Sequence, residues 1–431
     1  MKKNLLLSLL VVGSITSTMS AQEYTVDDLI TTSLKNSPDI AISRASYEAS
    51  QKRYDAAFSS YLPKIDLKLS GGVRSQDGGI IQDGPVNDTL LLGKLSASQL
   101  VYDFDKTGGT VDTRSFEVKS YDMDNKQQVS DKIKDVKTAY YDVLKAKSLI
   151  DVRNEDVKLN EAQVYRSQKY FDAGIRTKID VSDAQVSLIK SKIALNNATY
   201  NLESTYANLD KVVGFTNTTR DYEVYYKEID LDAIKEYLKQ YNFSLKECVE
   251  YAYNNKAEVM SYKYQLEASK AQIESINAEY YPSIYLYGDY TKQKIDKLKQ
   301  YMPQDTWQTS VNLDWNLYQG GSTNARKEEK VINADIAQSK LVFAQLRIKQ
   351  SVTHAYINLA QKKDEVILSK SLVDVSSEKF DQASKRYENG LADFIELQQA
   401  RQDYIDAKAN LVNTFYDYYI AIAKLDNAIG K

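Results

Sequence analysis

The sequence of 431 residues has one cysteine, Cys248, and one histidine, His354. A single cysteine cannot form a disulfide within the chain, so packing must supply the stability. A single histidine excludes a catalytic or metal site built on several histidines. We find no glycine-rich phosphate loop and no cluster with metal-ligand spacing. The sequence therefore predicts a protein that is not an enzyme, with no cofactor and no bound metal.

Long apolar runs are also scarce. Lys2 and Lys3 precede an apolar run at residues 5–12, and small residues follow. This order is typical of a signal peptide, which we place at residues 1–21. No segment reaches the roughly 20 apolar residues that span a bilayer as a helix. A place in a membrane would therefore require a closed β-barrel. The formal net charge of −3 gives no sign of a nucleic-acid partner.

The remaining chain contains two similar halves. Residues 171–175 (Phe-Asp-Ala-Gly-Ile) match residues 387–391 (Tyr-Glu-Asn-Gly-Leu), and a Leu-Asp pair precedes both Gly214 and Gly430. Matching motifs and matching glycines in the same order indicate an internal duplication. Each half reads as helix, strand, loop, strand, long helix and returning helix. We expect a first structural repeat at residues 22–214, a linker region at 215–242 and a second repeat at 243–431.

Four segments alternate between apolar and polar residues, as strands with one apolar face do. They are residues 64–74, 91–101, 283–291 and 306–317. An ordinary half-buried sheet is one interpretation, and a transmembrane β-hairpin pair is the other. Trp307 and Trp315 lie on the same face, eight residues or about 26 Å apart. That spacing favours a lipid-facing band with aromatic girdles. The connections 75–88 and 292–305 are then expected to be cell-surface loops.

The long helices carry an apolar residue at every seventh position. The two series are Val129, Val136, Val143, Ile150, Val157, Val164 and Phe171, and Val352, Leu359, Val366, Val373, Phe380 and Tyr387. A sustained heptad predicts left-handed coiled-coil packing. Gly174 and Gly390 end the long helices, and a shorter helix returns after each. The helix at residues 38–61 and a returning helix together match one long helix in length.

Several of these motifs resemble one known family. They are residues 174–184, residues 387–397, and the junctions Tyr-Asp-Phe at Tyr102 and Tyr-Gln-Gly-Gly at Tyr318. In this order, and twice over, they resemble the TolC-like outer membrane efflux family across essentially the whole mature chain. The resemblance implies an α+β membrane protein. It also implies that long antiparallel coiled-coil helices form an α-barrel tunnel and that four transmembrane strands per chain close a β-barrel only in an oligomer.

The resemblance also implies a homotrimer, with residues 215–242 as an equatorial region. The sequence itself says only that four strands are too few, because closed barrels start at eight. A dimer would satisfy that count as well.

The family resemblance implies a passive outer-membrane exit duct of a tripartite efflux or type I secretion system. Such a duct sits in the bacterial outer membrane, extends into the periplasm and works with a periplasmic adaptor and an inner-membrane transporter. A periplasmic coiled-coil adaptor or scaffold without a pore is the alternative. The sequence leaves the exported cargo open.

The candidate site residues follow from the same resemblance. The predicted periplasmic gate and tip comprise Gly174, Arg176, Asp180, Asp183, Gly390, Glu396 and Gln399. Gln399 stands where the family carries an acidic residue, so one acidic layer is missing. Solvated helix surface is the other interpretation of Asp180 and Asp183. Trp307 and Trp315 form the predicted lipid-facing girdle.

Overall fold

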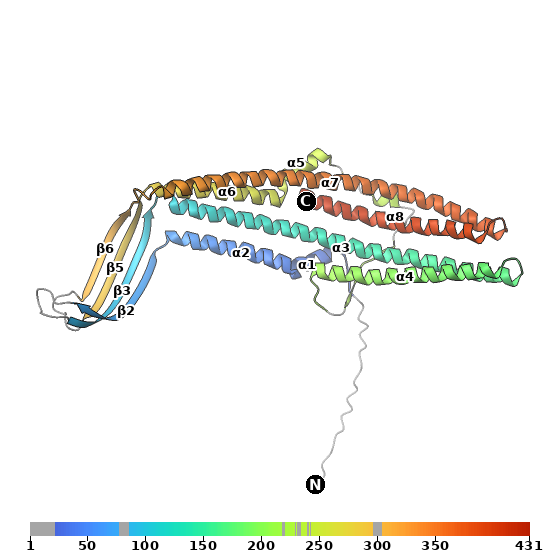
Figure 1. Cartoon of the computed structure of the whole chain (residues 1–431), viewed down its shortest axis with the longest axis horizontal. Coiled ribbons are helices and arrows are strands. Elements are labelled where there is room, and N and C mark those ends of the chain that lie inside the picture. The colour runs from blue at the N-terminus through green and yellow to red at the C-terminus, as the bar shows by residue number, and fades with distance from the viewer. Residues whose placement is uncertain are drawn as a thin grey trace, which may run out of the picture. The chain divides into compact units, whose positions relative to one another are not determined.

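The computed structural model describes residues 22–76, 86–217, 220–228, 230, 234–238, 241, 243–295 and 304–431 (Figure 1). The predicted signal peptide at 1–21 lies outside the described residues. So do residues 77–85 and 296–303 within the two predicted cell-surface loops. Among the residues described, no helix is both long enough and apolar enough to cross a membrane.

The helices repeat with matching lengths. Helices α1 (Val26–Asn36) and α5 (Leu245–Asn255) each have 11 residues, and α2 (Pro38–Phe58) and α6 (Ala257–Asn277) each have 21. The long helices α3 (Lys106–Asp172) and α7 (Ser322–Glu388) each have 67, and α4 (Lys178–Val213) and α8 (Phe394–Ile429) each have 36. These equal lengths confirm the predicted duplication. Three short 3-10 turns, η1 (Ser59–Tyr61), η2 (Ile234–Tyr237) and η3 (Ala278–Tyr280), are also present in the described part of the chain.

Helix α3 contains two glycines at its start. Gly108 and Gly109 lie inside its first turn. The Asp103 carboxylate accepts hydrogen bonds from the Thr107 backbone N–H at 2.8 Å and from its hydroxyl at 2.6 Å, which satisfies donors of the first turn. A Cβ on Gly109 would lie 2.6 Å from the backbone nitrogen of Ser275 in α6. Close approach of α6 therefore requires glycine at this helical position.

Four strands form one antiparallel sheet in the order β2-β3-β5-β6 (Figure 1). They are β2 (Lys64–Gln76), β3 (Val86–Tyr102), β5 (Ser283–Ile295) and β6 (Asp305–Asp314). Strand β5 continues four residues beyond the predicted end at 291, because β3 extends far enough to pair with it. Strand β6 stops three residues short of the predicted 317. Its last residue, Asp314, pairs with the first residue of β5, so nothing remains for residue 315 to pair with.

A second, smaller sheet was not predicted. Strand β1 (Gln22–Tyr24) pairs in parallel with β4 (Tyr222–Val224), which lies in the predicted linker region. A buried core packs around this sheet. It comprises Leu29, Val136, Ala139, Tyr140, Val143, Tyr206, Leu209, Val213, Tyr222 and Val224. Three-residue strands carry too little alternation to be recognised in a sequence.

The chain folds as two compact units, each drawn from several stretches of sequence. Of the residues described, the first takes those of 22–33, 136–235 and 369–416, and holds the β1–β4 sheet and both hairpin turns. The second comprises residues 34–135, 236–368 and 417–431, and holds the four-stranded sheet.

Candidate functional sites: the hairpin turns and the four-stranded sheet

Two equivalent turns join the long helices to the returning helices. Gly174 follows α3 with φ of +72°, and Gly390 follows α7 with φ of +71°. The N–H of Ile175 donates to the Tyr170 carbonyl, and the N–H of Leu391 donates to the Arg386 carbonyl, both at 2.8 Å. These are the bonds of a left-handed helix end. An added Cβ at either glycine would meet no atom within 4 Å, so backbone conformation alone requires glycine here.

Arg176 joins the first turn to the second. Its Nη2 donates to the Tyr387 carbonyl at 3.3 Å and to the Ala392 carbonyl at 3.0 Å. Its guanidinium carbon lies 4.7 Å from the centroid of the Tyr387 ring. Tyr387 is buried in a core of apolar side chains at the turns. The residues of this core are Ala184, Ala383, Tyr387, Ala392, Phe394, Leu397 and Ala400.

The predicted acidic residues have separate surroundings. The Asp180 side chain accepts hydrogen bonds from the Thr177 N–H and hydroxyl at 2.9 and 3.0 Å, which makes a capping box at the start of α4. Asp183 is exposed one turn later on the same helix. Asp180 therefore caps α4, and Asp183 lies on the exposed surface of the same helix.

The corresponding residues of the second repeat are Glu396 and Gln399. Each is exposed, and each has a charged partner. The Glu396 carboxylate lies 3.2 Å from Nε of Arg386. The Gln399 side chain donates to the Asp403 carboxylate at 2.7 Å. Asp403 also accepts a hydrogen bond from Lys379 at 2.7 Å, which together with the Gln399 bond lowers the pKa of its carboxyl group. Asp403 and Arg386 are thus charged residues beside the predicted gate that the family motif did not identify.

A buried ion pair in the first unit was also missed. Arg401 of α8 pairs with Asp156 of α3, and each side chain is only 7% exposed. Asn160 donates to the same carboxylate at 3.0 Å. Burial raises the pKa of Asp156 and lowers that of Arg401. A cavity of about 50 Å³ lies beside the pair, lined in part by Gln163 and Arg166. Removing one partner of such a pair leaves an uncompensated buried charge, which is strongly destabilising. The ion pair therefore holds α8 against α3.

The four-stranded sheet has one apolar face that the described chain leaves uncovered. One row across it consists of Leu67, Leu95, Tyr290 and Trp307, paired strand to strand. Their exposed fractions are 68, 48, 45 and 80%. The neighbouring row on the opposite face consists of Lys68, Lys94, Thr291 and Thr306. An uncovered apolar face excludes the ordinary half-buried sheet within this chain.

The ends of this face differ in detail from the predicted pattern. Trp315 is 54% exposed and lies just past β6, where its indole N–H donates to the Tyr280 carbonyl at 3.0 Å. A bulge in β3 between Leu100 and Tyr102 changes the pairing, so that Tyr102, not Val101, lies opposite Ile284. The bulge inserts one unpaired residue, which no count of alternation detects.

Within the described part of the chain, no group of three or more His, Cys, Asp or Glu side chains is placed to hold a metal ion. The exposed apolar face of the sheet is typical of membrane proteins, and the duplicated helical hairpins indicate a class built from two repeats. The chain matches the family described as "Outer membrane efflux protein" over residues 29–215 and 249–431. It belongs to the outer membrane efflux protein family.

Relatives in sequence and in structure are also outer-membrane efflux proteins and channels. Outer membrane protein TolC of Vibrio cholerae is 23% identical over 414 residues, covering 92% of this chain and 88% of that protein. Outer membrane efflux protein BepC of Brucella suis is 19% identical, covering 98% and 89%. The solved outer-membrane channel OprN aligns with a TM-score of 0.81 at 16% identity, covering 94% of this chain and 89% of that one. The CmeC outer membrane channel of Campylobacter jejuni aligns with a TM-score of 0.80, covering 94% and 85%.

These findings confirm the predicted fold class and the predicted outer-membrane location.

Proposed function

We propose that the chain is one protomer of a passive outer-membrane exit duct that works with a periplasmic adaptor and an inner-membrane transporter. The observation that carries the proposal is the four-stranded sheet. One of its faces is apolar and exposed, and the other is lined by lysine, aspartate, serine and threonine. Apolar-out and polar-in strands are what a water-filled transmembrane barrel requires. The relatives named above are efflux proteins and channels.

An oligomer must complete this duct. Strands β2 and β6 lie at the two edges of the described sheet, with unpaired backbone groups on their outer sides. In a bilayer those groups need partners, and four strands are below the minimum of eight for a closed barrel. We propose a homotrimer, in which β2 of each chain pairs with β6 of the next.

The helical part offers an independent argument for assembly. Ile179, Val186, Ile193 and Tyr200 recur every seven residues along α4, and their exposed fractions are 70, 49, 55 and 69%. We call these four residues the α4 stripe. In the second repeat, Ala409 and Tyr416 occupy the positions of Ile193 and Tyr200, and they are only 7 and 3% exposed. At the positions of Ile179 and Val186, the second repeat has Ile395 and Gln402, which are exposed as well. Only the second half of this coiled-coil seam is thus covered in one repeat and uncovered in the other. A neighbouring copy would cover it.

We propose that the two hairpin turns form the periplasmic gate of this duct. Arg176 links the turns through the Tyr387 and Ala392 carbonyls. Exposed Glu396 would face its symmetry mates in a trimer and attract cations to the lumen. The division into repeats at 22–214 and 243–431, with 215–242 between them, remains part of this proposal.

The test is conductance of the purified, assembled protein in planar lipid bilayers. We expect stepwise channels that prefer cations, and we expect Glu396→Ala to reduce that preference. Glu388→Ala is the control, because Glu388 is a carboxylate on the other side of the turn, paired with Arg166 at 2.7 Å. An assembled protein that never conducts would favour the adaptor or scaffold hypothesis instead.

A further inference from the structure

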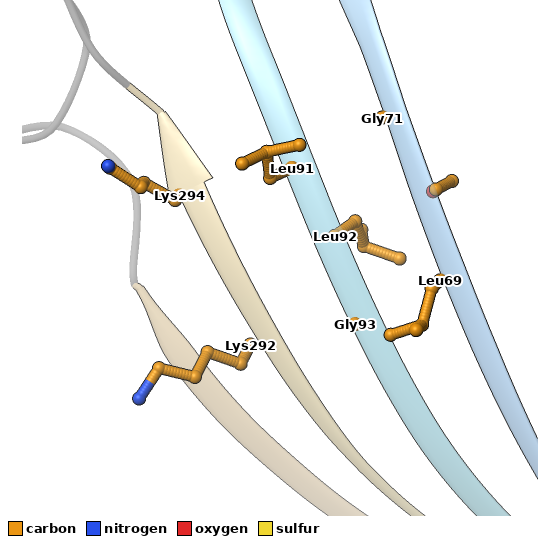
Figure 2. Close-up of a pocket in the computed structure, with 8 residues that line it drawn as sticks. Leu69, Gly71, Leu91, Leu92, Gly93, Lys292 and Lys294 are labelled. Carbon is orange, nitrogen blue, oxygen red and sulfur yellow. The ribbon is translucent and has the colours of Figure 1, made fainter.

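A hollow of about 510 Å³ lies on the apolar face of the four-stranded sheet (Figure 2). It is lined by residues 69–71 of β2, residues 91–93 of β3, and Lys292 and Lys294 of β5. Ser70 and Leu92 belong to a row of the polar face, and the other lining residues lie on the apolar face. The hollow lies where β2 ends and β3 begins, and in the proposed duct this end, with the connections 75–88 and 292–305, faces the cell exterior.

Glycine and leucine alternate across the two strands to form the hollow. Gly71 pairs with Leu91, and Leu69 pairs with Gly93. A Cβ on Gly71 would lie 3.1 Å from Cδ2 of Leu91, and one on Gly93 would lie 3.3 Å from Cδ2 of Leu69. Each leucine therefore leans over the glycine of the neighbouring strand. The two leucines remain 75 and 53% exposed, so the hollow is an apolar surface open to the surroundings of the sheet.

Two lysines border this apolar surface. Lys292 pairs with Gly93 and Lys294 pairs with Leu91, so both residues lie on the apolar face, at the β5 side of the hollow (Figure 2). Lys292 also forms an ion pair with Asp305 at 3.7 Å and keeps 72% of its side chain exposed. The two lysines are two residues apart on one strand, about 7 Å along its axis.

The order of residues along the face gives the depth of the hollow. The row next to Lys292, toward the helices, carries the exposed aromatic residues Tyr290 and Trp307. Aromatic side chains of this kind lie at the membrane interface, and lysines just beyond them reach the level of lipid phosphates. In the proposed duct, the hollow and the lysines would therefore lie at the boundary between acyl chains and headgroups.

We propose that this hollow binds a phosphorylated glycolipid of the outer leaflet, with an acyl chain over Gly71 and Gly93 and phosphates at Lys292 and Lys294. The inference rests on the proposed orientation of the duct. The apolar hollow selects a lipid over free phosphate, which has no apolar part to place there. Two cations about 7 Å apart suit a headgroup that carries more than one phosphate.

The experiment measures binding of bisphosphorylated lipid A to the assembled protein in phosphatidylcholine nanodiscs. We expect the Lys292→Ala/Lys294→Ala double variant to bind about thirtyfold more weakly, from the contribution of each lysine near a lipid surface. Gly93→Leu fills the hollow and should also weaken binding. Lys68→Ala, on the opposite face, and Gly288→Leu, on the same face outside the hollow, are the matched controls and should bind like the parent.

Three results would overturn the inference: equal binding of dephosphorylated lipid A, equal binding of phosphatidylglycerol, or equal loss in the control variants. Displacement of lipid A by millimolar inorganic phosphate would also overturn it, since that would show a simple anion site. Conductance in planar bilayers separates the two proposals. A parent protein that conducts but does not retain lipid A refutes only the lipid site, whereas one that does not conduct refutes the proposed duct.

Discussion

Individual side chains at the hairpin turns hold two distant parts of the sequence together. Arg176 is the clearest case, because one guanidinium contacts two backbone carbonyls and one aromatic ring of the second repeat. A guanidinium can do this with its several fixed donors, whereas a lysine offers a single point charge.

We expect Arg176→Ala to increase the conductance of the duct in planar bilayers, because the turns lose the contact that joins them. Arg176→Lys should give an intermediate result. Lys178→Ala serves as the control, since Lys178 lies in the same region and its ammonium group lies 5.4 Å from the centroid of the Phe171 ring of its own hairpin. Unchanged conductance in both Arg176 variants would show that other contacts hold the gate closed.

Another residue-scale contact concerns the small sheet of the first unit. The Glu223 carboxylate accepts hydrogen bonds from Lys147 at 2.8 Å and from the Tyr206 hydroxyl at 2.6 Å. Burial opposes its charge, but these two bonds outweigh burial and lower the pKa of Glu223. A carboxyl group with a lowered pKa stabilises the fold above its unfolded pKa of about 4.3, and that contribution is lost as the pH falls through the folded pKa.

Glu223→Gln should therefore reduce stability by about 1 kcal/mol at pH 7. Its Tm should approach that of the parent as the pH falls below about 4, where the parent loses the same interaction. Thermal unfolding followed by circular dichroism at both pH values measures the difference. Glu228→Gln, in the same segment and exposed, should match the parent throughout. A Tm gap that does not change with pH would contradict this account.

The elements repeat in conformation even where their sequences differ. At the junction between strand and long helix, the first repeat has Phe104 and Asp105 with φ of +52° and +76°. The second repeat has Gly320 and Gly321 at the same positions, with φ of +61° and +85°. The Phe104 ring stacks on Tyr281, with centroids 5.0 Å apart. Side-chain packing thus offsets in one repeat a strain that glycine avoids in the other.

Gly321→Ala should lower the stability by about 1 kcal/mol, since a Cβ in a left-handed conformation is strained even where space is open. Gly72→Ala is the matched control, because it too has open space but lies in a strand with ordinary φ. The Tm of the assembled protein in detergent measures both. Equal values would mean that the junction tolerates positive φ without cost.

The assignment of the apolar face of the sheet to lipid can be tested by substitution. Val311→Arg should prevent stable membrane insertion, because a charge on the lipid face near the midplane costs about 2–4 kcal/mol. Val311 is 70% exposed on the apolar face, between the two tryptophans. Ser310→Arg places the same side chain on the opposite face and should insert. Membrane fractionation and heat-modifiable migration follow insertion, and equal insertion of both variants would reject our assignment of the faces.

At the scale of the whole molecule, the chain carries surfaces that we propose another copy completes. The α4 stripe and the two free edges of the sheet require partners of different kinds, a coiled-coil seam and a strand. A closed ring of identical chains supplies both at every interface.

Ile193→Asp should weaken assembly, because burying an isoleucine in the seam contributes about 1.5–3 kcal/mol at each interface. Light scattering of the detergent-solubilised protein gives the mass of the assembly, and we expect three copies for the parent. Lys190→Asp, on the same helix and exposed, controls for added charge. If Ile193→Asp assembles like the parent, then α4 faces solvent or another protein.

The sequence alone determined the duplication, the long helices, the four strands and the alternation of their faces, because these features repeat with periods of seven and two. Local chemistry also determined the turns at Gly174 and Gly390, which need a left-handed backbone. Only the tertiary structure decided that Arg176 contacts Tyr387 and that Asp156 and Arg401 are buried together. Those contacts join residues that are far apart in sequence, and no period records them. The end of β6 at Asp314 and the bulge in β3 were likewise decided by the neighbouring strand, because a strand continues only where a partner accepts its hydrogen bonds.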